Sequence, residues 1–323
     1  MSSFGRFHRN TKYEETAEVV GREKQERTEW REIMKEIGCV PFRDGKKLLY
    51  QLWDGAIVEV AVFSYRGTEK NGIHICMPSQ VGCPIGCLFC ATTYAPIPFQ
   101  RNLLQEELCE IIDTIQRGAS KALPVDVISF SGHGEPLLNY DAVCGCLSRY
   151  EDSIGQGFIT TVGIRNELEK IMETGSIPGK FFLSLHGSSD AERGKIIPQH
   201  AGMARMSDLK KFAEFLLRND QTVTFNYMLT KENTDIASAR RLHNYLMEIG
   251  SVSVRFTPVF PIDCTKSPAL PDDTDSFLGE FSNLCSNTNI LWRLSRPTGN
   301  EIGIACGQMR AHRINKEVHH ATE

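Results

Sequence analysis

Three cysteines stand close together in residues 82–90, with CxxxCxxC spacing at Cys83, Cys87 and Cys90. Thiolates are the usual protein ligands of iron–sulfur clusters, and three of them on a four-iron cubane leave one iron open for another ligand. Structural zinc sites usually pair one CxxC-type knuckle with a second pair downstream, and no second pair follows here. The spacing therefore favours a [4Fe–4S] cluster over a zinc ion or three unrelated thiols.

The composition limits the class of protein. The chain has 323 residues, of which 41% are hydrophobic, with a net charge of −4 and 11 cysteines. No signal peptide and no apolar span of membrane length stand out, and an odd number of cysteines is typical of a reducing compartment. We expect a cytoplasmic monomer without a membrane partner. The net negative charge also predicts that any contact with nucleic acid uses a local basic face.

The elements ahead of these cysteines are predicted from charge and alternation. Residues 1–45 are dense in charges of both signs and are expected to form a helical or loose arm. Alternating runs at 47–53 and 56–63 flank Asp54-Gly55 and predict a β-hairpin, within an extension over residues 46–72.

From residue 73 onward the chain alternates between strand-like and helical segments. We assign residues 73–310 to one core and 311–323 to a C-terminal tail. Short β-branched or aromatic runs alternate with helical segments such as 103–115, 206–217 and 236–249. This alternation predicts a parallel α/β fold, either an open sheet or a partial barrel. The expected strands are 73–77, 125–131, 158–162, 181–185, 223–229 and 252–258.

The residues suited to chemistry fall at the ends of these strands. The cysteine loop follows the first strand and the segment 133–136 follows the second, while Thr160 lies in the third. Ser184 and His186 close the fourth strand. In parallel α/β folds, ligands bind at the carboxyl edge of the strands, so we expect one site built from these loops.

With these residues in view, the chain resembles the radical S-adenosylmethionine (SAM) RNA methyltransferases of the RlmN and Cfr type, over residues from about 46 to 310. The family carries a cysteine seven residues before the first cluster ligand, which is Cys76 here, in a CxxSQxGC context. Its GEPLLN, SLH and ACGQ segments are present at 134–139, 184–186 and 305–308.

The resemblance implies a radical SAM partial (βα)6 barrel with a small N-terminal β-hairpin extension. It also implies that SAM binds the open iron of the [4Fe–4S] cluster, with electrons from a donor such as flavodoxin or ferredoxin. Phe89 would stack near the adenine of SAM, and Thr160 stands where the family has a serine. The remaining positions implied to bind SAM are Gly134, Glu135, Pro136, Ser184, Leu185 and His186.

The resemblance further implies a relay between two cysteines. Cys306 matches the cysteine that accepts a methyl group from SAM, and a radical generated from a second SAM then removes hydrogen from that methyl group. Cys76 matches the residue that helps to remove a proton from the adduct and then forms a disulfide with Cys306. Glu59 matches a glutamate near the target base, although it equally fits the solvent face of a hairpin strand. The implied product is RNA, ribosomal or transfer, methylated on an adenine carbon, with C2 favoured over C8.

Departures from the family keep alternatives open. His133 replaces a methionine, Phe260 replaces an asparagine that contacts SAM, and residues 297–302 lack a basic TRGDDI segment. The helical RNA-binding module that precedes the hairpin in the family is expected to be missing or reduced to the arm. The alternatives are the same chemistry on a nucleotide or another substrate, a radical SAM enzyme of another reaction type, and a metal-binding module without catalysis.

Overall fold

A computed structural model describes residues 34–66, 71–119, 123–198, 200, 202–259, 270–295 and 306–320. Its main element is a ten-stranded sheet in the order β1-β2-β3-β4-β7-β8-β9-β10-β11-β12, beside a small two-stranded sheet of β5 and β6. The strands of the large sheet are β1 (Lys35–Phe42), β2 (Gly45–Gln51), β3 (Ile57–Arg66), β4 (Asn71–Met77), β7 (Val125–Phe130), β8 (Gln156–Thr161), β9 (Lys180–Ser184), β10 (Thr224–Leu229), β11 (Ser253–Pro258) and β12 (Leu291–Leu294). The small sheet consists of β5 (Gln80–Gly82) and β6 (Phe99–Asn102).

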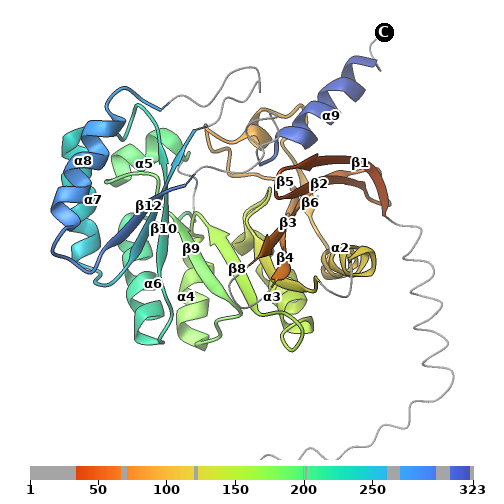
Figure 1. Cartoon of the computed structure of the whole chain (residues 1–323), viewed down its shortest axis with the longest axis horizontal. Coiled ribbons are helices and arrows are strands. Elements are labelled where there is room, and N and C mark those ends of the chain that lie inside the picture. The colour runs from red at the N-terminus through yellow and green to blue at the C-terminus, as the bar shows by residue number, and fades with distance from the viewer. Residues whose placement is uncertain are drawn as a thin grey trace, which may run out of the picture.

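Within the large sheet, the strands from β4 onward are parallel and follow one another in chain order, with helices in the connections (Figure 1). The helices are α2 (Gln105–Gly118), α3 (Tyr140–Arg149), α4 (Arg165–Thr174), α5 (Asp190–Ile196), α6 (Met206–Arg218), α7 (Ile236–Met247), α8 (Thr274–Cys285) and α9 (Gln308–His320), with short 3-10 turns η1 (Ala91–Tyr94) and η2 (Pro136–Asn139). This confirms the predicted α/β fold with its six parallel strands, and β12 is an additional strand. Its four residues are mostly exposed and carry little hydrophobic signal.

The inner and outer faces of the parallel strands differ in polarity. Along β10 and β11, half-buried and buried residues alternate strictly. The buried set includes Tyr227 and Phe256, which pack in edge and stacked contacts with Phe277 and Phe281 of α8. Strands of a parallel sheet that is covered on both faces are usually apolar throughout. The half-buried polar set here therefore marks an inner face that lines a cavity.

The antiparallel strands continue the same sheet. β2 and β3 pair as the predicted hairpin, and β3 joins β4. The expectation for residues 35–42 was wrong, because they form β1, paired with β2, instead of part of a helical or loose arm. Their charges occupy exposed positions of an edge strand, so charge density alone misled the prediction. Residues 1–33 lie outside the described residues.

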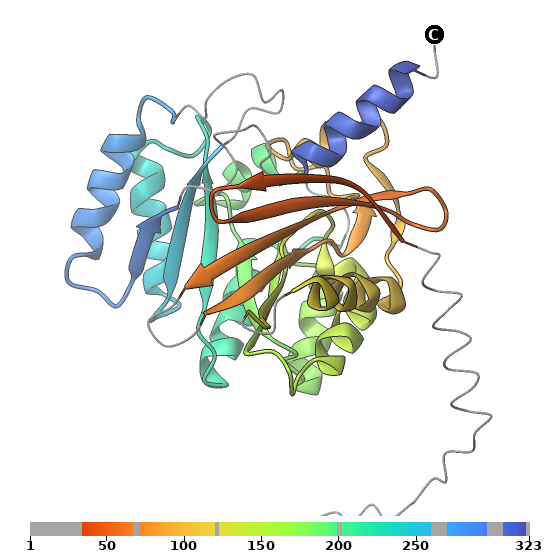
Figure 2. The ribbon, with the colours of Figure 1, turned by 45° about the vertical axis from the view of Figure 1, so that its right-hand side comes forward.

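The C-terminal helix α9 begins at Gln308, ahead of the predicted boundary at residue 311. It lies against β3 and η1, where the buried side chain of Arg310 donates from Nε to the Ile57 carbonyl at 2.7 Å. Figure 2 shows α9 rising beside the long antiparallel strands. The last described segment of the chain is thereby attached to the hairpin of β2 and β3. No helix among the described residues has the length and apolar character needed to cross a bilayer.

Candidate active site

A cavity of about 500 Å³ opens on the inner face of the parallel strands and their carboxyl ends. The structure brings most of the sequence-predicted site residues to its wall: Glu59, Cys76, Cys83, Cys87, Phe89, Cys90, Gly134, Glu135, Thr160, Ser184, His186 and Cys306. Two predicted residues do not line it. Leu185 is fully buried in the hydrophobic core, and Pro136 begins the buried turn η2.

The loop that carries Cys83, Cys87 and Cys90 owes its shape to glycine. Gly82 has a φ of 85°, and a Cβ there would lie 2.0 Å from the carbonyl oxygen of Pro98. The Cys83 amide instead donates to that carbonyl at 2.7 Å, which fixes the start of the loop. Ile85 of this loop packs into a cluster of buried apolar residues that includes Val162 and Ile196. The hydrogen bond and the apolar packing therefore hold the loop that carries the three cysteines in place.

Burial disfavours the thiolate form of these cysteines unless positive charge is bound beside them. Burial raises the pKa of Cys83 to about 12, and burial together with the like charges of Cys90 and Cys83 raises that of Cys87. Nearby positive iron would offset both effects, because metal coordination deprotonates a thiol. Within the described residues, no group of three His, Cys, Asp or Glu side chains converges as single-ion ligands would. A cubane places each thiolate on a separate iron, so this donor set fits a [4Fe–4S] cluster.

Glu135 holds the 134–137 loop against β8. Its Oε1 accepts from the Thr161 hydroxyl at 2.5 Å and its Oε2 from the Val162 amide at 2.9 Å, and Oε1 also accepts from the Leu137 amide. Burial still raises the pKa of this carboxyl group above its usual value, against the opposing effect of these hydrogen bonds. Glu135 thus fixes the position of its own loop. Thr161 makes the hydrogen bond to Glu135, and its neighbour Thr160 lines the cavity.

His186 presents a neutral ring to the cavity. Its φ is 54°, in the left-handed region, which turns the ring away from the strand direction. Nδ1 accepts from the Met228 amide at 3.0 Å, so the ring proton is on Nε2. Burial lowers the pKa of His186 to about 3, and the ring meets Phe89 edge-on with centroids 5.0 Å apart. His186 can therefore donate one hydrogen bond to a ligand without carrying a charge.

Cys76 and Cys306 meet at one residue although they lie far apart in the sequence. The Sγ atom of Cys76 is 3.2 Å from the Ser131 hydroxyl, and that of Cys306 is 3.8 Å from the Ser131 carbonyl oxygen. Surrounding protein raises the pKa of both thiols, and the nearby ammonium of Lys47 opposes that rise in each case. Two nucleophilic side chains therefore share one end of the cavity.

The position of Cys306 depends on Glu59. This buried carboxylate accepts from Lys47 Nζ at 2.5 Å and from the amides of Gly307 and Arg310, each at 3.0 Å. These amides belong to the N-terminus of α9, where backbone N–H groups have no partner within the helix, and Glu59 supplies their hydrogen-bond acceptor. The helix begins two residues after Cys306. The sequence analysis left Glu59 either near the target base or on the solvent face of a hairpin strand, and it missed Lys47. The second alternative was wrong, because Glu59 is buried and lines the cavity. In the structure, both residues anchor the Cys306 loop.

His133 connects two further backbone segments at the same end of the cavity. Its Nε2 accepts from the Glu59 amide at 3.0 Å, and its Nδ1 donates to the Gln80 carbonyl at 2.8 Å. Burial lowers its pKa to about 3, so the ring remains neutral. His133 thus connects β3 to the cluster-loop strand β5. Phe260 and residues 297–302, which the sequence analysis noted as departures, lie outside the described residues.

Other cavity residues escaped the sequence analysis, among them His74, Asn226 and Arg255. They occupy alternate, half-buried positions of β4, β10 and β11. The polar alternation within otherwise apolar parallel strands is the signal that could have identified them.

The fold and this arrangement of thiols define the class as a radical SAM enzyme, and comparisons agree. No known protein-family model matches the sequence. The structure of a radical SAM methyltransferase from Sphaerobacter thermophilus superposes with a TM-score of 0.71, covering 89% of this chain and 86% of that one at 23% identity.

Sequence relatives define the family. The chain is 31% identical over 279 residues to the probable dual-specificity RNA methyltransferase RlmN of Thermosipho melanesiensis, covering 83% of this chain and 77% of the relative. It is 30% identical over 290 residues to the ribosomal RNA large subunit methyltransferase N of Nitrosopumilus maritimus, covering 85% and 80%. The chain therefore belongs to the RlmN family of radical SAM methyltransferases, which use a [4Fe–4S] cluster and SAM.

Proposed function

We propose that this enzyme methylates an adenine carbon of ribosomal or transfer RNA, C2 in preference to C8, through a methylated cysteine. The observation that carries the proposal is the approach of the Cys76 and Cys306 sulfur atoms to the same residue, Ser131, in the cavity that the cluster cysteines line. RNA is proposed because the relatives are named as RNA methyltransferases.

The residues that would hold the cofactors follow from the cavity wall. Cys83, Cys87 and Cys90 would ligate the cluster, and His186 and Phe89 face the space beside them. When bound, the cluster and SAM supply an electron and a radical that can remove hydrogen from an unreactive methyl group. The donor of that electron is proposed to be a flavodoxin or ferredoxin.

The two cysteines then have different tasks. Cys306 loses its thiol proton and attacks the methyl carbon of SAM, so that a sulfur–carbon bond forms and S-adenosylhomocysteine leaves. Lys47 lies close enough to favour the thiolate form of both cysteines. Cys76 takes the proton from the substrate carbon once that carbon is joined to Cys306 through the former methyl group. The unpaired electron of the adduct passes to the oxidised flavodoxin or ferredoxin. The Cys76 sulfur then bonds to that of Cys306 as the sulfur–carbon bond to the product breaks, and the former methyl carbon keeps that electron pair and takes up the proton from Cys76. An external reductant reopens the disulfide.

Mass spectrometry of protein from cells tests this relay. In wild-type enzyme, Cys306 should carry one methyl group. Cys76→Ala should retain that first methylation and accumulate as a covalent adduct, because nothing remains to cleave the thioether bond. Cys306→Ala should show neither modification. An unmodified Cys306 in active enzyme, or full methyl transfer by Cys76→Ala, would contradict the proposal.

The attached fragment in Cys76→Ala also identifies the substrate. We expect an RNA oligonucleotide with the link at adenine C2, together with loss of the corresponding methyladenosine from the RNA of cells that lack the protein. A mononucleotide or a metabolite on the protein would retain the chemistry and replace RNA as the substrate. We place the reaction in the cytoplasm and the enzyme as a monomer.

A further inference from the structure

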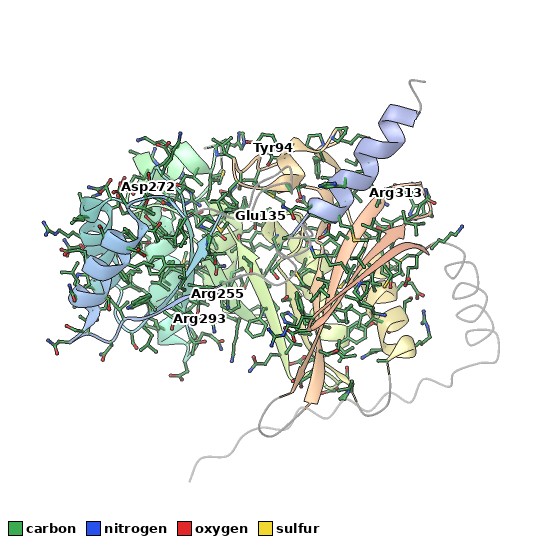
Figure 3. All side chains as sticks on the ribbon, turned by 45° about the horizontal axis from the view of Figure 1, so that its top comes forward. Tyr94, Glu135, Arg255, Asp272, Arg293 and Arg313 are labelled. Carbon is green, nitrogen blue, oxygen red and sulfur yellow. The ribbon has the colours of Figure 1, made fainter. Side chains whose placement is uncertain are left out.

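Two arginines lie side by side on the inner face of the sheet. Arg255 of β11 and Arg293 of β12 are Cα partners in parallel strands, and register partners project from the same face. Arg255 lines the cavity, as does Ser295, which shares its strand face with Arg293. Figure 3 shows the two arginines next to each other. Arg255 therefore contributes a guanidinium group to the cavity wall, and the exposed Arg293 lies next to it on the edge strand β12.

The positive charges of this arginine pair have no acidic partner in the part of the chain that the structure describes. The only charged group that acts appreciably on Arg255 is Arg293, which has the same sign. The Nε atom of Arg255 is buried and makes no hydrogen bond with any described residue. Its guanidinium lies 4.8 Å from the centre of the Phe182 ring, which supports the planar group from one side. Like charges at directly opposed positions of a sheet are unfavourable, so this arrangement is suited to an anion that bridges them.

Arg255 lines the same cavity as the reactive cysteines Cys76 and Cys306. Burial, with a smaller contribution from the Arg255 charge, lowers the pKa of His74 to about 4. His74 lies on β4 two residues before Cys76 and thus on the same strand face. On the other side, Asn226 of β10 is the Cα partner of both Arg255 and Ser184. An anion on the arginine pair would therefore belong to a ligand that also reaches the cysteines.

We propose that Arg255 and Arg293 bind a phosphodiester group of the RNA strand that carries the target base. The inference rests on the proposed function, since it names the part of the substrate that enters this side of the cavity. Guanidinium groups match the two free oxygens of a phosphodiester, and such backbone contacts fix the register of a nucleic acid without reading its sequence. The arginine pair thereby orients the nucleotide whose base faces Cys306 and Cys76.

The test compares a charged with an uncharged backbone on the anaerobically reconstituted holoenzyme. The probes are the trinucleotide ApApA and its methylphosphonate analogue, which keeps the bases and removes the backbone charge. Wild-type enzyme should bind ApApA about tenfold or more tightly than the analogue at low salt, with the preference shrinking as salt rises. Arg255→Met and Arg293→Met should each lose most of this preference and bind the analogue as wild type does. Arg293 is exposed, so its variant tests the site even if Arg255→Met fails to fold.

Arg240→Met is the matched control. Arg240 is an exposed arginine that pairs with Glu280 at 2.7 Å between α7 and α8, and its removal should leave the preference intact. A preference that persists in Arg255→Met and Arg293→Met would overturn the inference. So would a selective loss of SAM affinity in these variants, which would assign the arginines to the SAM carboxylate. If Cys306 is methylated but the wild-type enzyme binds ApApA no more tightly than the methylphosphonate analogue, only this inference is refuted. If Cys306 is unmethylated in active enzyme, the proposed function is refuted.

Discussion

Replacing Lys47 by methionine should destabilise the enzyme far more than removing a lysine from a surface ion pair. Lys47 and Glu59 are both almost completely buried, with Nζ and Oε1 2.5 Å apart. Lys47→Met keeps most of the apolar stem and leaves the carboxylate with two backbone amides as its remaining described partners. Removing one member of a buried pair typically costs about 3–5 kcal/mol. At about 2.1 cal/mol/K of unfolding entropy per residue, a chain of 323 residues shifts by roughly 1.5 °C per kcal/mol, so Tm should fall by roughly 4–7 °C.

Anaerobic thermal unfolding of the holoenzyme measures this effect, and two variants complete the comparison. Lys210→Met removes the lysine of an exposed pair with Glu248 at 2.7 Å and should change Tm little, because solvent screens that pair. Lys47→Met combined with Glu59→Gln removes both charges and should recover at least half of the loss. A Lys47→Met variant as stable as Lys210→Met, or a double variant no better than the single one, would refute the reasoning. Cys306 methylation should fall in Lys47→Met as well, since Glu59 anchors the Cys306 loop.

Three further predictions concern the cluster, its neighbouring loop and pH. Replacing Cys83, Cys87 or Cys90 with Ala should abolish the roughly four irons of the reconstituted enzyme, because each thiolate supplies one corner of the cubane; stoichiometric zinc in wild-type protein would contradict this. Glu135→Ala should reduce deoxyadenosine formation while sparing iron content, and unchanged turnover would remove Glu135 from the site. His133 has a folded-state pKa of about 3 against about 6.5 when unfolded, so its contribution to stability is complete above pH 6.5 and is lost toward pH 3. His133→Gln should therefore flatten the decline of denaturant midpoints between pH 7 and 5, and an unchanged slope would count against a buried neutral histidine.

Much of the fold follows from local pattern. The six predicted parallel strands are runs of β-branched and aromatic residues, and burial on the helix side requires such residues whatever the rest of the chain does. The hairpin at Asp54-Gly55 is equally local. β1 and β12 have no comparable pattern: they are edge strands with exposed side chains, and pairing with a neighbour that already exists stabilises them.

In the candidate site, too, some features follow from local sequence and others only from the fold. The sequence by itself predicts the cluster ligands, because Cys83, Cys87 and Cys90 lie within one short loop and their spacing is a local property. Motif resemblance also pointed to Cys76 and Cys306.

Only the tertiary structure decided which charges face one another, since these contacts join segments that are distant in the chain. Lys47 and Glu59 meet across β2 and β3 and hold the start of α9, and Arg255 meets Arg293 across β11 and β12. The free energy of a charge depends on burial and on its partners, and neither is encoded in the residue type alone. The position of Glu59 at the start of α9 and that of Arg255 in the cavity wall therefore became apparent only in the folded chain.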